Sequence, residues 1–109
     1  MHDDARRERD EIVALSMFTV ANGMTEEVKR AFRDRPHLVE QSPGFLRMEV
    51  IESVDDANEI WLLTYWAYGD SYHSWHRSHA HHESHRGIPK GLKLVSKSAR
   101  VKFVRHVGS

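Results

Sequence analysis

Residues 45–66 read FLRMEVIESVDDANEIWLLTYW, and this stretch predicts a β-hairpin at the centre of the chain. Its first eight residues alternate in hydropathy, which is typical of a strand with one buried face, here Leu46, Met48 and Val50. A short acidic and polar connection follows and has the length of a hairpin loop. Residues 60–66 are apolar on both faces, so we expect this strand to be covered on both sides.

One strand and one helix are predicted before the hairpin. Residues 12–20 carry apolar side chains on both faces of a strand, and the dipeptide Asn22-Gly23 ends it because both residues tolerate a positive φ. Thr25 is placed to cap the helix that follows, and the two acids after it suit the positive end of the helix dipole. The buried stripe of this helix has the 3.6-residue period and consists of Val28, Ala31 and Phe32.

A second helix and a last strand are predicted after the hairpin. Gly69-Asp70-Ser71 opens a helix that runs to about His85, and a final strand lies near residues 94–107. The order is therefore β-α-β-β-α-β, an α+β fold of the ferredoxin-like kind, with one antiparallel sheet and both helices on one face. The other face of the sheet is apolar and needs cover. We expect a second copy to supply it, which gives a homodimer with a closed interface.

The composition limits the classes to which the protein can belong. The 109 residues suffice for one domain, which we expect at residues 12–107, preceded by a charged leader at residues 1–11. The 16 basic and 16 acidic side chains balance, which argues against nucleic acid as a partner. Without cysteine the chain has no disulfide and no thiolate metal site. With no signal peptide and no apolar run of membrane-spanning length, we expect a soluble, cytoplasmic protein without a membrane partner.

Residues 72–85 read YHSWHRSHAHHESH and hold six of the nine histidines. If this segment is helical, one stripe of it holds Tyr72, Trp75, His79 and His82. Imidazole is the commonest protein ligand of transition metals and also binds haem iron. A solvated face or a metal-binding surface without catalysis is the competing interpretation. A zinc site is not favoured, because no HExxH arrangement is present.

For the remaining candidate residues, taken by themselves, a structural interpretation is favoured. Trp61 and Trp66 lie in the third strand, which favours the core over a cofactor contact. Ser16 faces inward on the first strand, where small polar residues are tolerated. The sequence shows no nucleophile elbow, no glycine-rich phosphate loop and no fingerprint of a flavin or NAD site. The residues alone thus point to a pocket beside the second helix without naming its ligand.

Several motifs together resemble the antibiotic-biosynthesis-monooxygenase superfamily. They are the segment from Phe18 to Phe32, the element SPGF at residues 42–45, the strand ending in Trp66 and, nine residues later, Trp75. Within this superfamily, the spacing from Trp75 to His85 is similar to that of the IsdG-type haem-degrading monooxygenases. The resemblance spans residues 12–107 and implies a dimeric α+β barrel.

The resemblance also implies roles for individual residues. His85 takes the place of the proximal ligand of the haem iron, and Trp75 that of the tryptophan that presses on the porphyrin. The family has an asparagine on the inward face of the first strand, and this chain has Ser16 at that position. A serine hydroxyl has one hydrogen-bond donor, whereas the asparagine amide has two. Haem binding tolerates this change more readily than oxygen activation does. Further contacts with haem are expected from Phe18, Trp66 and His82. If the helix is shifted by a turn, the ligand of the haem iron would instead be His82, His81 or His79.

The function that follows from the resemblance is haem degradation. Haem would serve as substrate and cofactor together, and the porphyrin would be opened with dioxygen and with electrons from an external donor, releasing iron. One alternative is a cofactor-independent monooxygenase of the same superfamily that acts on a small aromatic substrate. Another is a non-catalytic protein that binds haem or a metal ion.

Overall fold

The computed structural model describes residues 10–35, 37–78, 81 and 88–108. The elements follow the predicted order, with a short 3-10 helix added before the hairpin. They are β1 (Ile12–Thr19), α2 (Thr25–Arg33), η1 (Val39–Gln41), β2 (Phe45–Glu52), β3 (Glu59–Trp66), α3 (Ser71–His76) and β4 (Arg100–Val104). In the described part of the chain, no helix is long and apolar enough to cross a membrane.

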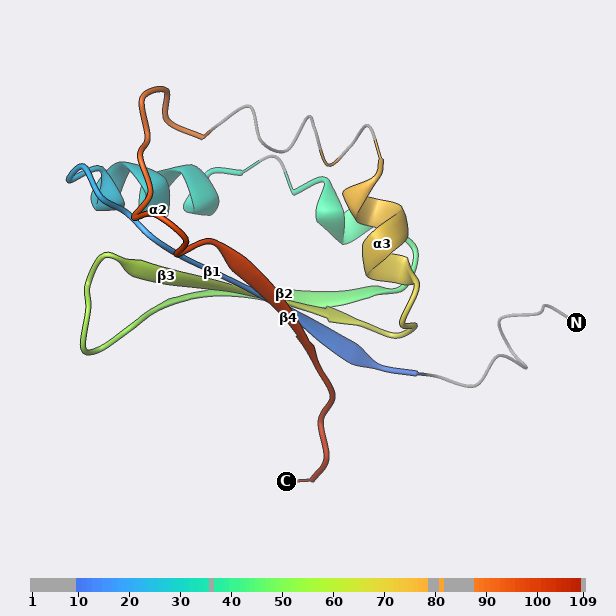
Figure 1. Ribbon diagram of the computed structural model, residues 1–109. Helices are drawn as coiled ribbons and strands as arrows, with labels where there is room; N and C mark the ends of the chain where they lie inside the picture. The colour runs from blue at the N-terminus through green and yellow to red at the C-terminus, as the bar shows by residue number, and fades with distance from the viewer. Residues whose placement is uncertain (1–9, 36, 79–80, 82–87, 109) are drawn as a thin grey trace, which may run out of the picture.

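The four strands form one antiparallel sheet in the order β2-β3-β1-β4. The strand β1 is central and pairs with β3 along its whole length, from Ile12 opposite Trp66 to Thr19 opposite Glu59. Both helices lie on the same face of this sheet, as Figure 1 shows. The predicted α+β class and ferredoxin-like topology are therefore confirmed.

The helix α2 has the predicted stripe and charge pattern but not the predicted cap. Thr25 is the first residue of the helix, and the preceding Met24 makes no side-chain capping bond. The Thr25 hydroxyl instead donates a hydrogen bond of 2.7 Å to Oδ1 of Asn58, in the connection between β2 and β3. The prediction of a threonine cap was wrong because a nearby amide oxygen binds this hydroxyl, which ties α2 to the hairpin.

The helix α3 is shorter than predicted and ends at His76. The backbone N–H of Ser78 donates to the carbonyl of Trp75 at 2.9 Å, and its hydroxyl donates to the same oxygen at 2.6 Å. A serine side chain that binds the backbone in this way competes with the next helical hydrogen bond. The expected continuous helix to about His85 is therefore wrong at this point, although His81 is again in a helical conformation.

The last strand is also shorter than the predicted range of residues 94–107. Leu94 forms an isolated bridge with Val20, and regular pairing with β1 resumes only at Arg100. Between them Lys97 has a φ of 64°, a left-handed conformation that no regular strand contains. The side chain of Ser98 meanwhile accepts the N–H of Thr19 at 3.1 Å and so replaces a strand hydrogen bond.

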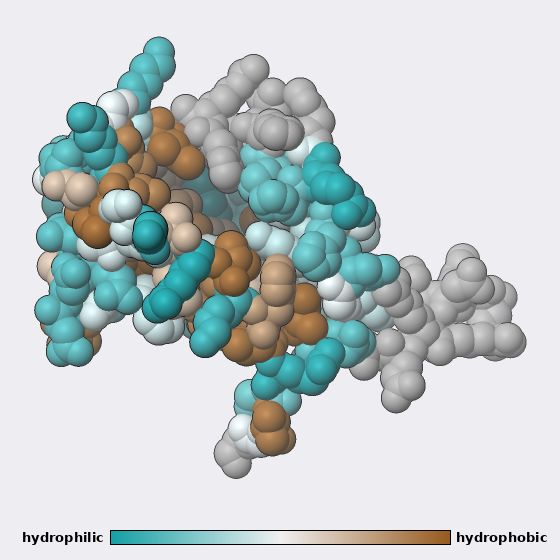
Figure 2. Space-filling model, viewed as in Figure 1, coloured by the Kyte–Doolittle hydropathy of each residue, from teal (hydrophilic) through white to brown (hydrophobic). Residues whose placement is uncertain are grey.

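The two faces of the sheet differ in how they are covered. Under the helices, a buried cluster of four residues forms the core: Ala14, Val39, Trp66 and Trp75. On the opposite face, the two central strands present an apolar band of paired residues, which comprises Val13, Leu15, Met17, Trp61, Leu63 and Tyr65. Charged residues of the outer strands border this outer band, among them Glu49 and Lys102. Apolar side chains also reach the surface along β4, where Val101 and Phe103 are about half exposed (Figure 2).

A close approach between Gly44 and Ser71 fixes the start of α3 against the sheet. Gly44 has a φ of +83°, and a Cβ atom added there would lie 2.8 Å from Cβ of Ser71 and still closer to its hydroxyl. Real Cβ atoms essentially never approach so closely. Only glycine therefore suits both the backbone conformation and the space at this position.

We predict that Gly44→Ala destabilises the protein more than Gly91→Ala does. Gly91 has the same φ of +83° but no neighbouring atom within 4 Å, so it isolates the backbone penalty of roughly 1–2 kcal/mol. The steric overlap at Gly44 should add about 1–3 kcal/mol, as overpacking does elsewhere. Urea unfolding of both variants measures the difference, and equal losses would contradict a tight contact between Gly44 and Ser71.

Candidate functional site

A pocket of about 370 Å³ lies between the inner face of the sheet and the helices. Its floor takes one or two residues from each strand: Ser16, Phe18, Met48, Leu62, Thr64 and Val101. One wall is the buried stripe of α2, and another is the apolar segment of residues 88–94. That segment is held to the end of β1 because the Asn22 side chain donates to the Gly91 carbonyl at 2.7 Å and Ala21 N–H donates to the Lys93 carbonyl at 2.8 Å.

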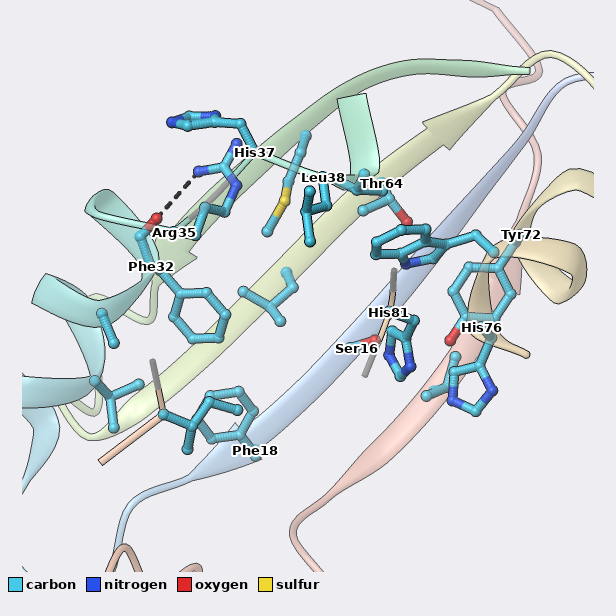
Figure 3. A pocket seen from close by; sticks show the side chains of 18 of the residues that line it. Ser16, Phe18, Phe32, Arg35, His37, Leu38, Thr64, Tyr72, His76 and His81 are labelled. Carbon is cyan, nitrogen blue, oxygen red and sulfur yellow. Dashed lines mark hydrogen bonds between the residues drawn. The ribbon is translucent and has the colours of Figure 1, made fainter. Parts of the chain in front are cut away.

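The pocket has a polar end and an apolar end (Figure 3). Ser16, Tyr72, His76 and His81 gather at the polar end. At the apolar end, the rings of Phe18 and Phe32 lie 6.4 Å apart and tilted against each other. A ligand here would thus meet aromatic surface on one side, and hydroxyls and imidazoles on the other.

The helix α3 brings three aromatic side chains to the polar end. Trp75 is buried, and its ring meets that of His81 edge-on at 5.5 Å. His76 lies 4.6 Å from His81, between centroids, and stacks on Tyr72 at 5.7 Å. The backbone N–H of His81 also donates to the hydroxyl of Ser78 at 3.2 Å. The serine that ends α3 therefore also helps to place His81 against Trp75.

Tyr72 is packed against four rings. Besides His76, it contacts Trp66 at 6.0 Å, His73 at 5.5 Å and Phe103 at 5.3 Å, all three edge-on. Burial raises the pKa of the Tyr72 hydroxyl above its ordinary value of 10.0, because the charged phenolate loses solvation. The hydroxyl therefore carries its proton at neutral pH and acts as a hydrogen-bond donor.

Arg35 brings a positive charge to the pocket wall, next to His37 and away from His76 and His81 in Figure 3. Its Nη1 donates to the carbonyl of Phe32 at 3.1 Å, and its Nη2 forms an ion pair with Glu40 at 2.8 Å. Its Nε is buried and has no hydrogen-bond partner within the described part of the chain. A guanidinium with a free donor in an apolar pocket is suited to a carboxylate or another anion.

The structure places the predicted site residues in three groups. Ser16, Phe18, Trp75 and the alternative ligand His81 line the same pocket. Trp66 does not line it: this side chain is fully buried in the core, and its Nε1 donates to the Thr64 hydroxyl at 2.8 Å. This is the core position that its strand favoured, and the contact with haem that the resemblance implies stays a prediction. His79, His82 and His85 lie outside the described residues.

Several lining residues were not among the predicted ones, namely Arg35, His37, Thr64 and His76, and Tyr72 was placed on the helical stripe without a role. Thr64 lies on the inward face of β3 with Leu62, so strand alternation carried a signal for it. Arg35 and His37 follow the end of α2, and no periodicity identifies them. Among the residues that the structure describes, no group of three or more His, Asp or Glu side chains is arranged to hold a metal ion.

Comparison with known proteins identifies a related enzyme. A "Heme oxygenase (mycobilin-producing)" from Mycobacterium tuberculosis is 29% identical over 80 residues, which is 72% of this chain and 76% of that protein.

Solved structures share the fold. One is SnoaB, a cofactor-independent oxygenase from Streptomyces nogalater, with a TM-score of 0.72, 17% identity and coverage of 92% of this chain and 96% of that one. Another is the heme-degrader MhuD from Mycobacterium tuberculosis, with two hemes bound in its active site, at a TM-score of 0.71, 23% identity and coverage of 90% and 97%. At these identities, the likeness establishes the fold and leaves the ligand open.

The family itself is established by a direct match. The model of the family "Antibiotic biosynthesis monooxygenase" matches residues 11–87, which is more than half of the chain and includes every strand except β4. The pocket described above lies between elements of this matched region and the segment that follows it. The chain belongs to the antibiotic biosynthesis monooxygenase family.

Proposed function

We propose that this chain is a haem-binding, haem-degrading monooxygenase. The observation that carries the proposal is an apolar pocket in which the ring of Trp75 and the imidazole of His81 meet at one end. The relationship to a protein named as a heme oxygenase supports it. So does the shared fold of MhuD, which holds two hemes in its active site.

The residues present fit a haem group. A porphyrin needs flat apolar surfaces, and the pocket offers Trp75, Phe18 and Phe32. Its iron needs an imidazole, and its carboxylates need donors or cations. His81 lies at one end of the pocket, and the free Nε of Arg35 lies on the wall away from it. The volume of about 370 Å³ also falls within the range of ordinary ligand pockets.

We assign the iron ligand to His85, on the resemblance in spacing described above. His81 is the first alternative, because its ring already packs against Trp75. When bound, haem would supply an iron that activates dioxygen and a porphyrin that is itself oxidised. The chain orients the porphyrin with Trp75, excludes water with Phe18 and Phe32, and depends on an external electron donor.

A cofactor-independent monooxygenase is the second candidate function. It is favoured by Ser16, which stands where the haem-degrading branch has an asparagine, and by the fold shared with SnoaB. In that case the same pocket would hold a small aromatic substrate between Trp75 and Phe18. A haem carrier without oxygenase activity is the third candidate function. Serine in place of asparagine at position 16 would impair oxygen activation more than haem binding.

Titration with hemin tests the proposed function. We expect a shifted Soret band in the wild-type protein and a loss of affinity of at least about tenfold in His85→Ala, since even indirect disturbance of a metal site has that effect. His81→Ala should lose less, and the exposed His106→Ala serves as the control. Addition of ascorbate under air should then bleach the Soret band and release iron.

Each other outcome of this titration selects a different function. Binding without bleaching would leave a haem carrier. No binding in the wild-type protein removes haem altogether, and turnover of a dihydroxyaromatic compound by the metal-free protein would then establish the second candidate. Affinity that falls in His81→Ala but not in His85→Ala would move the iron ligand to His81.

We also propose that two copies pair through the outer band of the sheet. Leu63 of β3 lies opposite Leu15 of β1 in the middle of that band. Leu63→Arg would place a charge there, which an apolar interface does not tolerate. In analytical ultracentrifugation the wild-type protein should therefore have twice the chain mass of 12.7 kDa, and Leu63→Arg should have the mass of one chain. Circular dichroism should show that Leu63→Arg is still folded. The control is Val54→Arg in the fully exposed hairpin loop, and a monomeric wild-type protein would contradict the pairing.

A further inference from the structure

Two hydroxyl groups of the pocket have no hydrogen bond within the part of the chain that the structure describes. They belong to Ser16 on β1 and Tyr72 on α3, and both residues line the pocket. The third hydroxyl of the lining, that of Thr64, already accepts the indole N–H of Trp66. The polar end of the pocket thus holds two hydroxyls that make no hydrogen bond with any residue that the structure describes.

The strand register brings these two residues close together. Ser16 pairs with Val101 of β4, and Phe103 is the next residue of β4 on the same face. The ring of Phe103 lies 5.3 Å from that of Tyr72. Tyr72 therefore packs on the strand that pairs with β1 beside Ser16, and in Figure 3 its hydroxyl points toward the end of the pocket that Ser16 shares with His76 and His81.

Ring packing alone does not explain a tyrosine at this position. Phenylalanine would make the same contacts with Trp66, Phe103 and His76. The hydroxyl adds a polar group in a partly buried place, where tyrosines usually have a hydrogen-bond partner. No described residue supplies that partner, and a ligand in the pocket can do so.

We propose that the hydroxyls of Ser16 and Tyr72 form a two-donor site for a small ligand atom that carries negative charge. This inference rests on the proposed function, because in an oxygenase that atom would be an oxygen that becomes negative as it is reduced. An asparagine amide has two donors and a serine hydroxyl has one. Tyr72 supplies the second donor at the same end of the pocket, so the serine at position 16 does not leave the site short of donors.

Fluoride is the probe for this site, since it is a small anion that only accepts hydrogen bonds. It is titrated into the hemin-loaded, ferric protein and its affinity is followed by absorbance. Tyr72→Phe keeps the ring and should lower the affinity for fluoride about tenfold, as expected for the loss of a hydrogen bond to a charged group. Ser16→Ala should lower the affinity for fluoride to a similar extent, and the double variant should lower it further. The control is Tyr65→Phe, whose hydroxyl lies on the opposite face of the sheet.

The result that overturns the proposal is unchanged fluoride affinity in Tyr72→Phe when hemin uptake is normal. A loss of affinity in His76→Gln but not in Tyr72→Phe would overturn it as well, because the anion would then be held by an imidazolium. Both results leave the proposed function intact, since hemin still binds.

A second measurement decides the matter if the wild-type protein takes up no hemin. 1,4-Naphthoquinone has two carbonyl oxygens that only accept hydrogen bonds, and the chain has no cysteine thiol to react with it. Its binding is followed by quenching of tryptophan fluorescence, for which Trp75 lies on the pocket wall. Weaker binding to Tyr72→Phe than to Tyr65→Phe would support the two-donor site, and equal binding would refute it.

Discussion

The contact between Gly44 and Ser71 determines where α3 begins, and the chemistry of the pocket depends on that position. All three α3 side chains at the polar end, Tyr72, Trp75 and His76, come from the six-residue helix that begins with Ser71. A side chain at position 44 would push α3 away from the sheet. The helix needs this external fixation because a helix of so few residues has little stability of its own.

Hydropathy patterns predicted the strands and their order, because a strand that is buried on one or both faces leaves a clear period in the sequence. The ends of α3 and β4 were not predictable in that way. A serine side chain that binds its own helix ends the first, and a left-handed lysine interrupts the approach to the second. Both depend on single hydrogen bonds or dihedral angles, which hydropathy does not record.

The candidate site was predictable only in part, for a similar reason. Ser16 and Trp75 followed from spacing and Tyr72 lay on the same predicted stripe as Trp75, whereas Arg35 reaches the pocket through the path of the chain after α2. For Trp66 the strand position favoured the core, and only the family resemblance implied a contact with haem. The side chain, at the end of β3, is part of the core, where the Thr64 hydroxyl accepts its N–H.

The pocket combines aromatic walls with a few polar groups at one end, and this combination suits binding of a flat, largely apolar ligand. Haem and a small aromatic compound would both use Trp75 and Phe18, so the difference between the two functions lies in whether an imidazole holds iron. A crystal structure of the protein grown with hemin tests this most directly. We expect the porphyrin against Trp75 with its iron bound to His85, and hemin bound elsewhere, such as on the outer band of the sheet, would contradict a haem-degrading site.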